Sequence, residues 1–236
     1  MTDWAALQTA YGSAEGIPAL LARAAAAGSD DQELWNELYS HLCHQGTVYS
    51  GSYAALPALA QMSVRHEPSD YIAALHLAAG IIASNDVVGD RTAVRRRYGR
   101  ELDECHAVAE QNLPLARDDT YFIYGLQALM AFEDGGVWQL QLDCLIHGEA
   151  ALQCPSCDED LLLDLDIAEP RVSGSSDDVA AAVTPLEPRA SSIEGRLLAL
   201  ARSNDRPVVA AELPYLFGTS SCPECHEPFS IPSALV

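Results

Sequence analysis

The sequence of 236 residues contains no lysine: its 13 basic residues are all arginine, against 34 aspartates and glutamates. P-loop phosphate sites, pyridoxal-phosphate enzymes and protein kinases each require a lysine, so its absence excludes these classes. The formal net charge of −21 disfavours nucleic acid and anionic membranes as partners, because a protein binds either one by neutralising its negative charge. A basic protein is the partner that this charge favours.

Membrane-crossing segments and export signals are also lacking. The longest apolar stretch, residues 71–83, is interrupted by His76 and is shorter than the ~20 residues that cross a bilayer. Residues 1–4 show neither a positive start nor an apolar run, so we expect a cytoplasmic protein. The seven cysteines, an odd number, then indicate reduced thiols or metal ligands rather than a disulfide framework.

Apolar residues recur at helical spacing through residues 1–149, and short connections separate the periodic segments. Short connections make successive helices antiparallel neighbours, so we expect a mainly α-helical domain here. A capping-box pattern over residues 29–32 marks one helix start, and Gly135 and Gly136 mark one helix end. Helices are predicted over residues 16–27, after residue 32, after residue 51, from residue 70, over 120–132 and over 137–146.

Two of these helices resemble each other in sequence. Residues 14–21 read A-E-G-I-P-A-L-L and residues 53–60 read Y-A-A-L-P-A-L-A, which places Pro18 and Pro57 39 residues apart. This spacing is close to the ~40–47 residue period of HEAT and armadillo repeats, in which helix pairs bury their apolar faces by stacking. Residues 112–116 are a weaker echo. The alternative is an irregular helical bundle with one accidental match.

A family resemblance follows from the segment W-N-E-L-Y-S-H-L-C-H-Q-G-T-V-Y-S-G-S-Y-A-A-L-P-A-L-A at residues 35–60. It resembles the repeat core of HEAT-like proteins from high-GC bacteria, some of which resemble immunity proteins of polymorphic toxin systems. The resemblance covers about the first 60 residues well and the remainder loosely. It implies an antiparallel helical-repeat array that binds another protein, although repeat scaffolds serve many unrelated partners.

Residues 150–236 have a different character and are predicted to form a small β subdomain interrupted by a helix. Residues 153–167 combine a cysteine turn with alternating Leu and Asp, which favours a strand. An acidic, Ser- and Pro-rich linker is expected over residues 170–189, followed by an inserted helix over 191–203. A short helical turn at 208–216 then leads into a second cysteine turn and strand.

The cysteine quartet is the strongest chemical signal. Cys154-Pro-Ser-Cys157 and Cys222-Pro-Glu-Cys225 each present two thiolates about one tetrahedral edge apart, and two such turns complete a four-thiolate zinc site. The pattern resembles a zinc ribbon, but 64 residues separate its halves against ~15–20 in the simple pattern. Because four thiolates leave no coordination position for a substrate, the zinc is expected to be structural.

Other interpretations of the quartet stay open. A redox C-x-x-C pair needs a βαβ background, and two disulfides need an oxidising compartment. Iron suits the spacing as well as zinc does, although Asp158 and His226 stand where rubredoxin-like turns carry glycine. His226 is also a conceivable substitute for Cys225 as a ligand.

Three further groups are candidate binding residues. Residues 91–100 hold five of the thirteen arginines and suit phosphate or RNA, but pairing with Asp86, Asp90, Glu101, Asp103 and Glu104 is the preferred interpretation. A polar turn between two helices is the second group, with Gly46 as a purely structural explanation. The third is an acidic segment that either confers solubility or receives a basic partner. The turn comprises His44, Gln45, Gly46 and Tyr49, and the acidic segment comprises Asp158, Glu159, Asp160 and Asp164.

No catalytic constellation is present: G-x-S-x-G, H-E-x-x-H and Gly-rich phosphate loops do not occur. We therefore expect a noncatalytic protein-binding scaffold with one structural zinc, for which an immunity protein neutralising a basic toxin is one form. The alternatives are an enzyme with a cleft in the helical domain, using His44 or His76, and a zinc-ribbon adaptor that binds nucleic acid.

Overall fold

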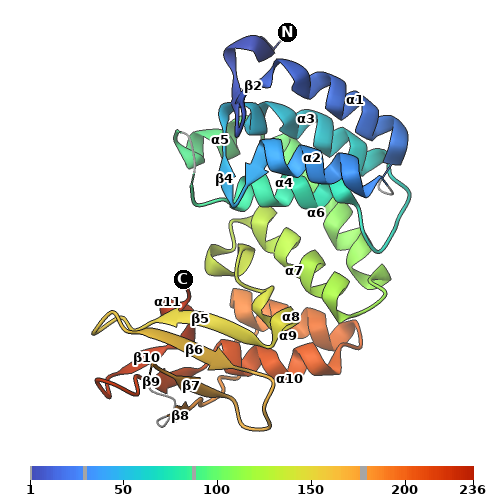
Figure 1. The fold of residues 1–236 in the computed structure, drawn as a ribbon. Coiled ribbons are helices and arrows are strands. Elements are labelled where there is room, and N and C mark those ends of the chain that lie inside the picture. Colours follow the sequence, from blue (N-terminus) through green and yellow to red (C-terminus); the bar gives the residue numbers. More distant parts are fainter. Residues whose placement is uncertain (1, 29–30, 87–88, 176–179) are drawn as a thin grey trace. The chain divides into compact units, whose positions relative to one another are not determined.

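The computed structural model describes residues 2–28, 31–86, 89–175 and 180–236 (Figure 1). It is mainly helical, with small antiparallel sheets, and divides into two compact units, Met1–Leu140 and Gln141–Val236. The break therefore precedes the boundary expected between residues 149 and 150. Across the described residues, no helix is both long enough and apolar enough to cross a membrane.

Seven α-helices among the described residues of the first unit provide its framework (Figure 1). Short 3-10 turns and two hairpins, β1 (Gln8–Thr9) with β2 (Gly12–Ser13) and β3 (Cys43–His44) with β4 (Thr47–Val48), connect them. The 3-10 turns are η1 (Trp4–Ala6), η2 (Ala14–Gly16), η4 (Leu113–Leu115) and η5 (Gly136–Gln139). The helices are α1 (Ile17–Ala27), α2 (Gln32–Leu42), α3 (Ser50–Arg65), α4 (Ala73–Ala83), α5 (Arg91–Arg97), α6 (Gly99–Asn112) and α7 (Asp119–Glu133).

The larger helices of the first unit pack in two rows. In one row α3 contacts both α1 and α6, in the other α4 contacts both α2 and α7, and each helix also packs on its sequence neighbour across the rows. Leu38, Leu56, Leu77 and Phe122 are completely or almost completely buried, so helices of both rows contribute to the core. The predicted periodicity thus matches the buried faces. The two segments matched in sequence lie at different points of their helices, since Pro18 is in the first turn of α1 and Pro57 is inside α3.

Carboxylate side chains cap three helices of this unit. The Asp31 carboxylate accepts a hydrogen bond from the Leu34 amide at 3.0 Å and starts α2, so this helix begins without the capping-box role expected of residues 29–32. Ser29 and Asp30 of that pattern lie outside the described residues. Asp90 and Asp118 cap α5 and α7 in the same way.

The helix predicted over residues 137–146 is wrong. The structure has the 3-10 turn η5 and a separate short helix, α8 (Cys144–His147), which packs on a strand of the second unit. Gly136 at φ +62° and Gly148 at φ +70° place left-handed turns before and after this stretch, which its apolar spacing alone did not reveal.

The second unit is built on an antiparallel four-stranded sheet in the order β5-β6-β7-β8. Its buried face includes Ala150 and Leu152 on β5 and Leu161 and Leu163 on β6, which alternate with exposed residues. A hydrogen-bonded bridge between Thr184 and Thr219 continues the sheet into the hairpin β9-β10. The elements are β5 (Glu149–Gln153), β6 (Asp160–Asp164), β7 (Arg171–Ser173), β8 (Ala180–Ala182), α9 (Ile193–Ser203), α10 (Pro207–Leu216), β9 (Thr219–Ser221), β10 (Pro228–Ser230) and α11 (Ile231–Ala234).

The linker expected over residues 170–189 is not a simple connector. Two of its segments are the strands β7 and β8, and Val172 and Val183 are buried. Pairing with neighbouring strands stabilises these three-residue strands. The sequence shows neither an apolar run nor a charge pattern that would have predicted them. Residues 176–179 of the predicted linker lie outside the described residues. The expected inserted helix corresponds to α9, and the expected short turn at 208–216 is the full helix α10.

Candidate metal centre

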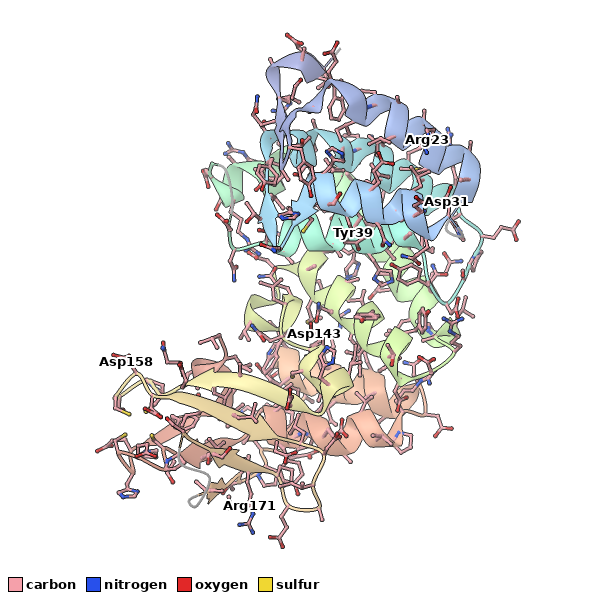
Figure 2. The ribbon with its side chains drawn as sticks, viewed as in Figure 1. Arg23, Asp31, Tyr39, Asp143, Asp158 and Arg171 are labelled. Atoms are coloured by element: carbon pink, nitrogen blue, oxygen red, sulfur yellow. The ribbon has the colours of Figure 1, made fainter. Side chains whose placement is uncertain are left out.

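Two β-hairpins of the second unit carry the four cysteines at their tips. Register pairs Gln153 with Asp160 on β5-β6, and Ser221 with Pro228 on β9-β10. The loops between these pairs read C-P-S-C-D-E at residues 154–159 and C-P-E-C-H-E at 222–227. We call these loops the first and second knuckles. Figure 2 shows Asp158 at the tip of the first hairpin, close to sulfur atoms.

The two knuckles share one backbone conformation. In the first, the Cys154 amide donates to the Glu159 carbonyl at 2.8 Å and the Asp158 amide donates to the Cys154 carbonyl at 3.0 Å. In the second, Cys222 donates to Glu227 at 3.0 Å and His226 donates to Cys222 at 2.9 Å. Asp158 and His226 both adopt the left-handed region, at φ 61° and 64°. Equivalent backbone bonds thus present the two cysteine pairs in equivalent ways.

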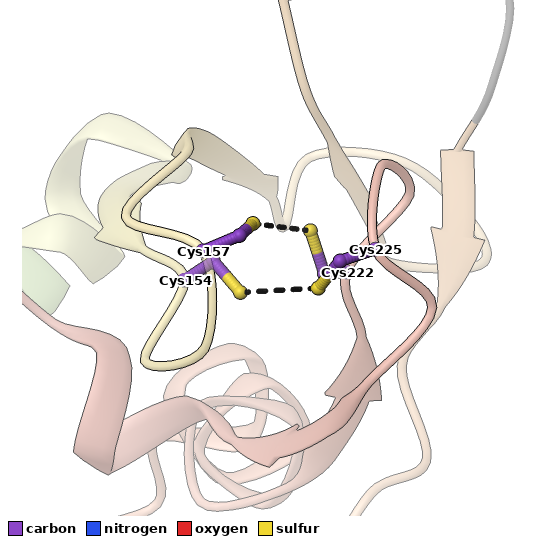
Figure 3. Close-up of side chains that lie close together, drawn as sticks. All are labelled: Cys154, Cys157, Cys222 and Cys225. Atoms are coloured by element: carbon purple, nitrogen blue, oxygen red, sulfur yellow. Dashed lines mark hydrogen bonds between the residues drawn. The ribbon is translucent and has the colours of Figure 1, made fainter.

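The four sulfur atoms form a compact cluster (Figure 3). Cys154 Sγ lies 3.7 Å from Cys225 Sγ, Cys157 Sγ lies 3.8 Å from Cys222 Sγ, and all four lie within 4.8 Å of one another. These separations exceed the ~2.05 Å of a disulfide bond, and the cysteines are free thiols. A tetrahedron with metal–sulfur bonds of ~2.3 Å has edges of ~3.8 Å, so four cysteines so arranged can hold a metal ion.

Backbone amides around the sulfur atoms favour the thiolate form needed for metal binding. Burial raises the pKa of Cys154, but hydrogen bonds from the Ser156 and Cys157 amides outweigh it and lower the pKa from 9.0 to about 7. The Glu159 amide acts on Cys157 in the same sense, but the adjoining thiols raise the pKa of Cys157 to about 12. Four neighbouring thiolates repel one another, and a divalent cation removes that repulsion.

The remaining described cysteines form no comparable group. Cys105 and Cys144 are buried in apolar surroundings, which raises the pKa of each thiol to about 12 and makes them unreactive packing residues. Within the described residues, the quartet is the one group of three or more potential ligands with converging ligand atoms.

The predicted polar turn forms the tip of the β3-β4 hairpin. Gln45 at φ 50° and Gly46 at φ 82° are the two central residues of a tight hairpin turn, and the Ser84 hydroxyl donates to the Gly46 carbonyl at 2.5 Å. His44 contacts Tyr11, whose hydroxyl lies 3.4 Å from His44 Nδ1. Tyr49 precedes α3 as its N-cap residue. Sequence reasoning missed Tyr11, which is 62% exposed and comes from the other hairpin of this unit.

The four predicted acidic residues differ in their surroundings. Asp158 and Asp160 are exposed, whereas Glu159 accepts hydrogen bonds from Ser175 and Asp164 accepts one from the Asp166 amide. The second knuckle adds the exposed carboxylates Glu224 and Glu227, which were missed in the sequence. The glutamate that ends both knuckles, at positions 159 and 227, is a signal for Glu227, whereas the first knuckle has a serine at the position equivalent to Glu224.

The arginines of residues 91–100 mainly serve structure. Arg91 donates to Asp134 Oδ1 at 2.9 Å and Gln139 Oε1 at 2.6 Å, and Arg95 donates to the Ala131 and Phe132 carbonyls at 3.0 and 2.6 Å. Both side chains thereby hold the C-terminal end of α7. Arg100 pairs with Glu101 and Glu104, as expected, whereas Asp86 accepts a hydrogen bond from Thr47 and Asp90 caps α5.

The candidate metal centre therefore consists of two equivalent knuckles that come together in one unit, although the strands β6 to β9 and the helices α9 and α10 lie between them in the sequence. Each supplies two cysteines to a cluster with the dimensions of a tetrahedral metal shell. Comparisons of the chain with protein-family models, with curated proteins and with solved structures found no significant match.

Proposed function

We propose that the protein is a noncatalytic binding protein whose second unit is stabilised by one structural zinc ion. The supporting observation is the cluster of four thiols, two of whose cross-knuckle distances, 3.7 and 3.8 Å, equal the ~3.8 Å edge of a zinc tetrathiolate. Four thiolates complete the shell and leave no open position for a substrate or an activated water. The role of the ion is therefore to hold the fold.

The ion adds a link between two hairpins that backbone pairing among the described residues also connects. The edge between the four-stranded sheet and β9-β10 is made by two backbone hydrogen bonds, Thr184 to Thr219 at 2.8 Å and the reverse at 3.0 Å, with Ser220 donating to the Ala182 carbonyl. Metal binding to four cysteines of a folded hairpin pair contributes directly to folding free energy, because the unfolded chain has no preformed site. Zinc is the proposed ion, and iron is the competing one with the same ligands.

The surface around the two knuckles supports recognition of a basic protein. Asp158 and Asp160 from the first hairpin and Glu224 and Glu227 from the second are exposed. A zinc ion with four thiolates itself carries a charge of about −2, so the knuckle surface is strongly negative. Such a surface attracts a basic partner and speeds its association. An immunity protein that neutralises a basic toxin is the form of this function that we propose.

Neutralising the knuckle carboxylates tests this function. The knuckle variant combines four substitutions, Asp158→Asn, Asp160→Asn, Glu224→Gln and Glu227→Gln. It should bind its basic partner roughly tenfold more slowly than wild type at low salt, because electrostatic steering is lost. The partner is isolated with the tagged full-length chain as bait, and its association rate is then measured over a range of salt concentrations. High salt should bring wild type and variant together, since the Debye length falls to ~3 Å at 1 M.

A control variant separates local from overall charge. This control variant loses the same number of exposed carboxylates, but from the first unit. It combines Glu15→Gln, Glu33→Gln, Glu67→Gln and Asp103→Asn. It should associate at close to the wild-type rate. Equal rates for wild type and the knuckle variant at low salt would show that the knuckle surface does not receive the partner.

A further inference from the structure

Four aromatic rings of the first unit are in continuous contact. Tyr121 meets Tyr71 edge to face with centroids 5.7 Å apart, Tyr71 stacks on His76 at 4.6 Å, and His76 meets Tyr124 at 6.3 Å. His76 belongs to α4, Tyr121 and Tyr124 belong to α7, and Tyr71 lies in the segment before α4. We call these four rings the aromatic ladder.

The aromatic ladder is half-buried, with part of it open to solvent. Tyr124 is 36% exposed, and Tyr71, His76 and Tyr121 are partly exposed, whereas nearly all other residues of α4 are buried. Tyr39 on α2 lies near the ladder, because its pKa is raised first by burial and then by the phenols of Tyr71 and Tyr124 among its neighbours. Partly exposed tyrosines that contact one another are typical of binding surfaces.

One arginine of the chain already binds to this surface. The guanidinium of Arg117 lies over the Tyr121 ring at 3.9 Å from its centroid, and Arg117 Nε lies 3.3 Å from Asp70 Oδ2. A second carboxylate, Asp118, is 3.9 Å from the same nitrogen. The contact shows how this surface accommodates a guanidinium, with a ring beneath it and a carboxylate at its edge.

Charge favours cations over the rest of the aromatic ladder. Residues 1–140 contain 8 arginines and 18 aspartates and glutamates, which gives this unit a net charge of −10. Burial lowers the pKa of His76 to about 4, so its imidazole is neutral near pH 7 and does not repel a cation. Tyr71 and His76 stack on each other, and Tyr124, at 36% exposure, is the most accessible ring of the ladder for a further guanidinium.

We propose that the aromatic ladder binds arginine side chains of a basic polypeptide, with each guanidinium stacked on a tyrosine ring beside a carboxylate. The partner's chemistry is that of the proposed function, on which this inference rests, but the site is on the first unit and involves none of the knuckle residues. Charge steers any basic partner toward the protein, whereas stacking on the tyrosine rings favours arginine over lysine.

Synthetic peptides with alternating arginine and glycine test the proposal, with lysine–glycine peptides of equal length and charge as the comparison. Binding to the full chain is measured by fluorescence anisotropy at about 0.15 M salt, where distant charges are screened. The arginine peptide should bind several-fold more tightly than the lysine peptide. Tyr124→Ser should weaken its binding roughly two- to fivefold, and Tyr71→Ser with Tyr124→Ser roughly tenfold or more.

Matched variants make the outcome decisive. Tyr124→Phe keeps the ring and should retain arginine binding, and circular dichroism confirms that each variant is folded. The knuckle variant should keep its preference for arginine over lysine, which separates this site from the proposed function. Equal affinity for the two peptides, or arginine binding that folded Tyr124→Ser and the double variant leave unchanged, would overturn the inference.

Discussion

Asp158 and His226 show how single residues set the geometry of the metal centre. Each follows the second cysteine of a knuckle in the left-handed conformation and donates its amide to the carbonyl of the first cysteine. Asparagine, aspartate and histidine tolerate this conformation better than other residues with a Cβ, and glycine tolerates it best. We therefore expect the turn to persist with glycine at either position.

At the same scale, His76 should make stability depend on pH. Its pKa is lowered from 6.5 to about 4, because burial penalises the charged imidazole. Between these values the unfolded chain binds the proton more readily, so the stabilising contribution is complete above about pH 6.5 and is lost as pH falls toward 4. Phenylalanine does not titrate, so the free energy of unfolding of His76→Phe should fall less than that of wild type as the pH is lowered. The difference should be roughly 2 kcal/mol, after allowance for the partial exposure of His76.

Urea unfolding of the full chain from pH 7.5 to 4.5 measures this contribution. The other titrating groups, the cysteine quartet included, are common to wild type and His76→Phe, so only the difference between the two curves is informative. That difference should change with pH below about 6.5. A constant difference over the whole range would show that His76 titrates alike in the folded and unfolded chains.

At the scale of elements, α5 stabilises the first unit through its arginines. Arg95 donates two hydrogen bonds to carbonyls in the last turn of α7, where the helix dipole also favours a positive charge. Arg95→Met should lower the free energy of unfolding by about 1–3 kcal/mol, because two buried carbonyls lose a charged donor. Chemical denaturation measures the loss.

The neighbouring Arg96 provides the control. It is exposed on the same helix, so Arg96→Met should change the free energy of unfolding by less than about 0.5 kcal/mol. Equal effects of the two substitutions would show that the bonds from Arg95 to Ala131 and Phe132 contribute nothing specific.

The elements differ in how far the sequence predicts them. Long periodic segments such as α3 and α7 were predictable, because an apolar stripe of several turns has no other stable partner than a core. The strands β7 and β8 were not, since three-residue strands depend on pairing with distant residues. The cysteine quartet was visible as a repeated C-P-x-C, but the aromatic ladder was not, because it combines Tyr71 and His76 with rings more than forty positions away.

At the scale of the whole molecule, the chain divides into two compact units of different architecture. The first is a two-row helical unit with a partly exposed aromatic ladder, and the second contains two hairpins whose four cysteines form the candidate metal centre. Both are acidic: the net charges are −10 for residues 1–140 and −11 for residues 141–236. In the function that we propose, this charge attracts a basic protein to either unit.

The metal content and coordination of the purified chain test the central claim most directly. Wild type, prepared under reducing conditions, should contain one zinc ion per chain, and X-ray absorption should show four sulfur neighbours at ~2.3 Å. Cys222→Ser should lose the ion and destabilise the second unit, whereas Cys43→Ser, outside the quartet, should keep it. Chain free of zinc and iron, or a zinc ion with fewer than four sulfur neighbours, would contradict the structural zinc centre.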